Sequence, residues 1–219
     1  MGNLKIFSIS VVRKYLMAIT GLFLSAFLIE HLYGNTMLLY NDGGEAFNQY
    51  CEDMTGNLII RIVEFVLFGA FLFHIIDAIV ISVQNKNARP QGYAVDKQSK
   101  NSSWYSRNMG FTGSIIFIFL ALHLRTFFFE HRVLTSSETY FDTVAFSFQH
   151  GWYVALYVIS MILLGAHLNH GIQSAFRSLG LSNKNYAGAL KTAGSAFAIL
   201  MAIGFASFPI IFYFNLLGR

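Results

Sequence analysis

Residues 15–37 read YLMAITGLFLSAFLIEHLYGNTM, an apolar stretch long enough to cross a bilayer as one helix. Arg13 and Lys14 stand just before it, and Glu30 and His31 lie late within it. A histidine inside a membrane span is costly unless it pairs with or binds something. This stretch therefore predicts both a membrane-spanning helix and a functional role for His31.

The rest of the chain repeats this apolar character. Its 219 residues are 55% hydrophobic and only 12% charged, whereas soluble domains carry about 25% charged residues. The runs are continuous rather than alternating, which favours helices over the strands of a barrel. We predict a single domain over 1–219, an all-α integral membrane protein with five transmembrane helices. The predicted spans are 15–37, 58–83, 109–129, 151–175 and 192–217.

The segments between the runs alternate in charge. Basic residues precede the first run and recur in 84–108 and 176–191, whereas 38–57 and 130–150 are mostly acidic. The positive-inside rule then predicts a multi-pass protein with a cytoplasmic N-terminus and an external C-terminus. The net charge of +4 is spread over these loops, which is not the concentrated patch of a nucleic-acid-binding protein. Segment 84–108 is interpreted either as a docking surface for a cytoplasmic partner or as a solvated loop that sets topology.

Four of the seven histidines fall one to an apolar run, namely His31, His74, His123 and His167. At 1.5 Å per residue, His31 and His123 lie roughly 27 and 24 Å from the cytoplasmic ends of their runs, and the other two roughly 15 Å. The pattern predicts an outer pair and an inner pair separated by roughly 10 Å. Two layers of facing imidazoles suit two bis-histidine haems in a four-helix bundle, with the fifth helix beside it. The single cysteine, Cys51, excludes a thiolate-ligated iron–sulfur cluster within this chain.

The chain also echoes itself. A Thr-Gly pair that begins at Thr20 lies eleven residues before His31, and a second that begins at Thr112 lies eleven residues before His123. This repeat strengthens the prediction that the two runs contribute equivalent ligands. The other histidine-bearing runs, 58–83 and 151–175, echo one another more weakly.

Several further residues are predicted around the two layers. Gly171 follows His167 by four positions and so shares its helix face, leaving room for a flat macrocycle. This favours His167 over His170 as the ligand. Arg13, Lys14, Arg177 and Lys191 are predicted either to pair with the carboxylates of the inner haem or simply to mark the membrane interface. Three other charged residues have alternative interpretations. Glu64 and Arg125 form an interhelical ion pair, or Arg125 meets a propionate of the outer haem. Asp77 supports the inner layer or contacts a partner subunit, or it makes a structural hydrogen bond.

Two stretches resemble a known family. They are 13–32, RKYLMAITGLFLSAFLIEHL, and 167–180, HLNHGIQSAFRSLG. Both are similar to the dihaem cytochrome b subunit of succinate:quinone oxidoreductases (succinate dehydrogenase and fumarate reductase) with one five-helix anchor and two haem b groups. The resemblance implies that His31 and His123 ligate the outer haem, and that His74 and His167 ligate the inner one.

The resemblance also implies partners and a location. A flavoprotein carrying FAD and an iron–sulfur protein would dock on the cytoplasmic side of a bacterial inner membrane, in a possible dimer of heterotrimers. Electrons would pass from succinate through these subunits and both haems to menaquinone or another quinone, or in reverse to fumarate. This chain would hold the haems and the quinone site, but not the succinate site.

The implied quinone site lies near the outer haem, where an acid exchanges protons with the outside. Glu52 and Asp53 are the candidates, with a solvated acidic loop as the plainer interpretation. Gly165 stands where some family members carry a proton-transferring glutamate. Three alternatives remain open: a dihaem cytochrome b of a hydrogenase or formate dehydrogenase, a transporter with a histidine relay, and an anchor without cofactors.

Overall fold

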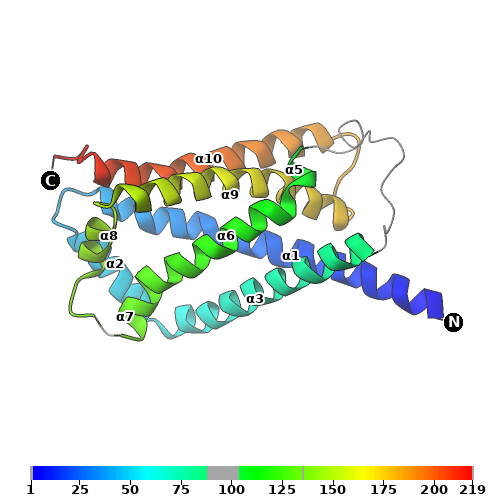
Figure 1. The fold of residues 1–219 in the computed structure, drawn as a ribbon, viewed down its shortest axis with the longest axis horizontal. Coiled ribbons are helices and arrows are strands. Elements are labelled where there is room, and N and C mark those ends of the chain that lie inside the picture. The colour runs from blue at the N-terminus through cyan, green and yellow to red at the C-terminus, as the bar shows by residue number, and fades with distance from the viewer. Residues whose placement is uncertain (1, 88–103, 135, 219) are drawn as a thin grey trace.

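The computed structural model describes residues 2–87, 104–134 and 136–218, and all regular structure in these ranges is helical. It confirms an all-α protein with five helices long and apolar enough to cross a membrane. Because the number of spans is odd, the two termini lie at opposite ends of the bundle (Figure 1). The spanning helices are α1 (Gly2–Thr36), α3 (Leu58–Asn87), the continuous run of α6 (Met109–His123), η2 (Leu124–Phe129) and α7 (Glu130–Arg132), then α9 (Gly151–Ser178) and α10 (Ala187–Tyr213).

The first four spans include the predicted runs, but the fifth is displaced by about one turn from 192–217. The chain leaves α9 through Gly180, which has a φ of 73° that suits glycine. The carbonyl of Asn183 then accepts a hydrogen bond from the Ala187 amide at 2.9 Å, so α10 begins there. At the other end Asn215 adopts a φ of 48°, and α10 is already over at Tyr213.

Short helices cover one end of the bundle, in segments where the sequence predicts only loops. They are α2 (Glu45–Gly56) and α8 (Tyr140–Ser147), at the same end of the bundle as the C-terminus in Figure 1. The side-chain oxygen of Asn48 on α2 accepts a hydrogen bond from the Phe141 amide of α8 at 2.9 Å. Gly44 precedes α2 with a φ of 93°, and a Cβ there would lie 2.2 Å from Phe141 Cγ. Only glycine fits that junction.

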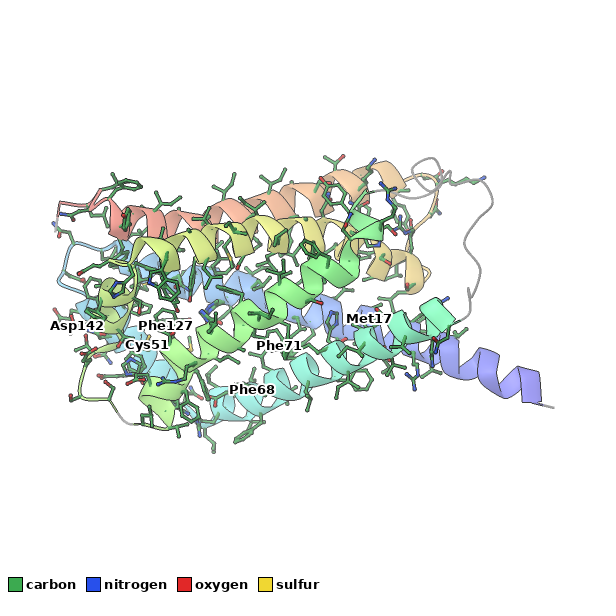
Figure 2. The ribbon with its side chains drawn as sticks, in the orientation of Figure 1. Met17, Cys51, Phe68, Phe71, Phe127 and Asp142 are labelled. Atoms are coloured by element: carbon green, nitrogen blue, oxygen red, sulfur yellow. The ribbon has the colours of Figure 1, made fainter. Side chains whose placement is uncertain are left out.

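Helix α9 is the most buried of the five spans and contacts α1, α6 and α10. It approaches α10 closely, because a Cβ at Gly165 would lie 2.9 Å from the Cβ of Ala202. Helix α3 lies at the periphery and packs mainly on α1. Aromatic rings lie between α3 and the bundle: Phe68 meets Phe128 at 5.1 Å between ring centroids, and Phe71 meets Phe27 at 6.5 Å. Figure 2 labels Phe68 and Phe71.

The two ends of the bundle differ in charge. Arg13, Lys14, Arg107, Arg177 and Lys191 belong to one end, which α5 (Trp104–Arg107) also shares (Figure 1). The opposite end carries the acidic residues of α2 and α8. Most of the predicted docking segment, 84–108, lies outside the described residues.

Candidate functional site

The four histidines of the predicted layers meet in two pairs inside the bundle. His31 of α1 faces His123 of α6, with ring centroids 5.7 Å apart and ring planes at 89°. His74 of α3 faces His167 of α9 at 6.4 Å and 66°. These are the pairs that the depth argument predicts, and His167 is the α9 histidine that meets His74. Each pair joins two helices far apart in the sequence.

The two pairs lie at different levels along the helices. Tyr157 places its hydroxyl 2.8 Å from Nδ1 of His123, and it precedes His167 on α9 by ten residues, or roughly 15 Å. On α1, His31 and the residue that touches His74, Thr20, are eleven residues or roughly 16 Å apart. The separation inferred from the structure is therefore larger than the roughly 10 Å that the sequence predicts.

The threonines of the repeat contact the inner pair. Thr20 Oγ1 lies 3.2 Å from Nδ1 of His74, and Thr112 Oγ1 lies 3.4 Å from Nδ1 of His167. Eleven residues make three helical turns to within about 20°, so each threonine shares a face with the outer histidine of its own helix. Thus α1 and α6 each provide one imidazole to the outer layer and one hydroxyl to the inner layer.

The glycines of the repeat lie against the same two inner rings. A Cβ at Gly21 would approach Cε1 of His74 to 3.4 Å, and a Cβ at Gly113 would approach Cε1 of His167 to 3.6 Å. These are ordinary van der Waals distances, so each glycine places its helix backbone beside the imidazole that the neighbouring threonine contacts. Each copy of the Thr-Gly repeat therefore contacts one inner histidine, with the threonine at Nδ1 and the glycine beside Cε1.

The outer pair is surrounded mainly by aromatic side chains. Phe27 stacks on His31 with centroids 5.3 Å apart and planes at 17°, and Phe205 lies 5.6 Å from the same ring. On the other side, the hydroxyl of buried Tyr153 donates to Thr126 Oγ1 at 2.9 Å. Thr126 belongs to the π-helical turn η2, a distortion that often marks functional sites.

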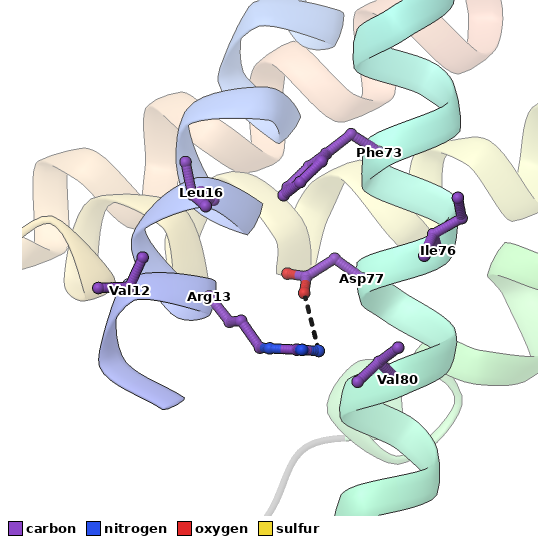
Figure 3. A pocket seen from close by; sticks show the side chains of 7 residues that line it. All are labelled: Val12, Arg13, Leu16, Phe73, Ile76, Asp77 and Val80. Carbon is purple, nitrogen blue, oxygen red and sulfur yellow. Dashed lines mark ion pairs between the residues drawn. The ribbon is translucent and has the colours of Figure 1, made fainter. Parts of the chain in front are cut away.

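At the basic end, Arg13 of α1 pairs with Asp77 of α3, one turn beyond His74. Arg13 Nη1 lies 3.7 Å from Asp77 Oδ1 (Figure 3). Asp77 is only 4% exposed, and its Oδ2 has no hydrogen-bond partner among the described residues. The pair lines a groove of about 420 Å³ whose other walls are Val12, Leu16, Phe73, Ile76 and Val80. The structure thus gives Arg13 a carboxylate partner within the chain, whereas Lys14, Arg177 and Lys191 are exposed.

We expect this ion pair to stabilise the fold mainly by neutralising Asp77. Arg13→Gln leaves a buried carboxylate unpaired and is expected to lower the free energy of unfolding by about 2 kcal/mol. Adding Asp77→Asn removes that charge and should recover most of the loss. Unfolding of the purified chain in detergent, followed for the four members of this double-mutant cycle, measures the coupling. If Arg13→Gln and the double variant had equal stability, this role of the ion pair would be contradicted.

The spacing of the two imidazole pairs matches the haem that the sequence predicts. An imidazole nitrogen binds a metal at about 2.0 Å, so two rings on opposite sides of one ion have centroids about 6 Å apart. Both pairs match this spacing. A Cβ at Gly171, on the face of His167, would meet no atom within 4 Å. Ser160, fully buried on α9 between the levels of Tyr157 and His167, has an Oγ without a hydrogen-bond partner in the described residues. The donor set and the spacing of both pairs therefore fit bis-imidazole ligation of two haems.

At the acidic end, the candidate quinone residues Glu52 and Asp53 are exposed on α2, and Asp53 accepts a hydrogen bond from Gln49 at 2.9 Å. Sequence reasoning missed a different pair, in which the hydroxyl of Tyr50 donates to Glu30, next to His31. Burial and this hydrogen bond raise the pKa of Tyr50, so it keeps its proton. Burial likewise raises the pKa of Cys51 to about 12, which leaves a neutral thiol.

The predicted Glu64–Arg125 ion pair is wrong. Glu64 pairs with Arg61 on its own helix at 3.2 Å and with Arg132 at 3.4 Å, whereas Arg125 pairs with Glu130 at 2.8 Å. In each case the residue pairs with a partner close to it in the sequence. For Glu64 this is Arg61, and for Arg125 it is Glu130, the first residue after η2. Arg125 is thereby engaged at the outer end of its own span.

Sequence reasoning also missed Tyr157, because an aromatic residue in an apolar run carries no signal of its hydrogen-bond partner. The repeat did single out Thr20 and Thr112, although not the histidines that they contact.

Comparison of the chain with models of protein families, with curated proteins and with solved structures finds no match.

Proposed function

We propose that this protein is the dihaem cytochrome b subunit of a succinate:quinone oxidoreductase. In this role it anchors the complex in the membrane and passes electrons between an iron–sulfur subunit and membrane quinone. The observation that carries the proposal is the meeting of four histidines, from four different spans, as two facing pairs at two levels. The resemblance of stretches 13–32 and 167–180 to that family selects this complex among those with dihaem cytochromes.

Each imidazole pair would hold one haem b, which supplies a one-electron Fe(III)/Fe(II) couple when bound. His74 and His167 would hold the inner group, and His31 and His123 the outer one. Two histidine ligands for each iron would favour electron transfer over binding of oxygen. The aromatic shell around the outer pair, with Phe27, Phe119 and Phe127 against its rings, keeps water away from it.

The charge of the bundle ends supports an orientation. The basic end, with Arg13 and Lys14, would face the cytoplasm and the flavoprotein and iron–sulfur partners. The inner pair would then lie nearer to the iron–sulfur subunit than the outer pair. Quinone would react at the acidic end, where Glu52 and Asp53 on α2 are candidates for exchanging its protons.

A reduced-minus-oxidised spectrum of the purified chain, with quantitation of haem as its pyridine complex, tests the proposal. We expect two low-spin haem b groups per chain that do not react with carbon monoxide. Affinity purification from native membranes is expected to recover a subunit with covalent FAD and one with iron–sulfur clusters. Folded, membrane-inserted protein without haem would overturn the dihaem proposal. Two haems together with hydrogenase or formate dehydrogenase subunits would overturn only the choice of complex.

A further inference from the structure

We infer that Thr20 and Thr112 are positioning residues that set the tautomer of the inner histidines. In this arrangement His74 and His167 each carry their proton on Nδ1, and each keeps the lone pair of Nε2 for a ligand held between them. The tautomers follow from the contacts of this chain alone. Their consequence for a haem rests on the proposed function.

At Thr20, the number of hydrogens on the hydroxyl decides the direction of its hydrogen bond with His74. A hydroxyl has a single hydrogen and two lone pairs. The hydroxyl of Thr20 donates that hydrogen to Leu16 O in the preceding turn, at 2.9 Å, while Met17 O lies farther away at 3.2 Å. The hydroxyl therefore meets Nδ1 of His74, 3.2 Å away, as an acceptor. The hydrogen in that contact belongs to the imidazole.

Thr112 repeats the same geometry on α6. Its hydroxyl donates to Asn108 O at 3.0 Å, with Met109 O farther away at 3.2 Å, and it lies 3.4 Å from Nδ1 of His167. Thr112 is only 2% exposed, so water does not compete for its lone pairs. In both α1 and α6, then, the threonine hydroxyl donates its hydrogen within its own helix. It faces the inner histidine only with its lone pairs.

The tautomer decides what the pair can bind. A neutral imidazole has one N–H and one lone pair, so a proton on Nδ1 leaves Nε2 as the only ligating atom. A hydrogen bond from the other ring nitrogen also orients a metal-bound imidazole and raises its basicity. The outer pair is built differently, because His123 contacts the phenol of Tyr157 instead. The two layers therefore receive different hydrogen-bond partners from the same four helices.

The tautomers can be measured without any cofactor. In haem-free, full-length protein labelled with 15N at the imidazoles and held in detergent micelles, we expect His74 and His167 to show Nδ1–H and a bare Nε2. Thr20→Val keeps the shape of threonine but removes the acceptor, so the His74 signal should move toward the Nε2–H form while His167 stays unchanged. Thr112→Val should do the reverse.

The controls are a variant that restores the hydroxyl and one that removes an unrelated hydroxyl. Thr20→Ser should return the His74 signal to its original position. Thr192→Val deletes a hydroxyl that bonds to Gly188 O of its own helix and should move neither histidine. A wild-type protein with Nε2–H at both inner histidines, or a Thr20→Val variant with unchanged signals, would overturn the inference.

Redox titration of the haem-loaded chain tests the consequence. Because a less basic ligand stabilises Fe(III) less, Thr20→Val and Thr112→Val are each expected to raise the midpoint potential of the inner centre. The outer centre should keep its potential, and Thr20→Ser should restore the inner one. A chain that binds no haem would defeat the proposed function but leave the tautomer measurement decisive. Two haems with unchanged potentials would contradict only the role of the threonines.

Discussion

Replacing His74 or His167 with alanine is expected to lower the haem content of the purified chain from two groups to one. Either change removes one of the two imidazoles that would hold the inner haem and that face each other at 6.4 Å, and it leaves the outer pair intact. His31→Ala or His123→Ala should likewise remove the outer group alone. Haem per chain, measured as the pyridine complex, reports the loss directly.

The layer that is lost can be identified from pairs of variants. His74→Ala combined with His167→Ala should still retain one haem, because both changes affect the same centre. His74→Ala combined with His31→Ala should retain none. His170→Ala is the matched control, since His170 lies three residues from His167 on α9 and should keep both haems. Retention of two haems by His74→Ala, or a loss in the His170 variant, would contradict the assignment of the layers.

Gly165→Glu is expected to destabilise the protein severely. A Cβ at this position would lie 2.9 Å from Ala202 Cβ and 3.3 Å from Ala198 O, so any side chain forces α9 and α10 apart. Overpacking costs about 1–3 kcal/mol, and a carboxylate within a span adds about 3 kcal/mol. We expect little folded protein from membranes and a sharply lower unfolding temperature in detergent.

A matched glycine separates this packing effect from helix propensity. Gly69 lies within α3, and a Cβ there would meet no atom within 4 Å. Gly69→Ala should therefore leave stability unchanged or raise it by about 0.5–1 kcal/mol. Gly165→Ala is expected to lower stability in the same assay. If Gly165→Glu instead folded normally and gained proton transfer across the membrane, the position would be a functional site of the kind known in the resembled family rather than a packing site.

The architecture of the spans was predictable because a bilayer imposes length and composition on every helix that crosses it. The pairing of His31 with His123 was predictable too, since helical rise converts sequence position into depth. Helix boundaries and short helices were less predictable, because contacts with neighbouring segments determine them. The start of α10 depends on the turn around Gly180 and Asn183, and α2 forms where Phe47 and Phe141 bury against the bundle.

Side-chain partners across helices were the least predictable part of the site. The repeat drew attention to Thr20 and Thr112, but a threonine in a helix usually bonds only to its own preceding turn. Nothing in one sequence shows that α1 passes behind His74 while α6 passes behind His167. For the same reason the partner of Arg13 was uncertain until α1 and α3 were seen side by side.

The eleven-residue interval shared by α1 and α6 ties the two levels together mechanically. Each of these helices carries an outer imidazole and an inner hydroxyl at a spacing that peptide geometry fixes, whereas the inner imidazoles belong to α3 and α9. A sliding or tilting α1 would move His31 and Thr20 together and would change the contact of Thr20 with His74 at the same time. A change in membrane thickness that tilts α1 would therefore be felt at both levels at once.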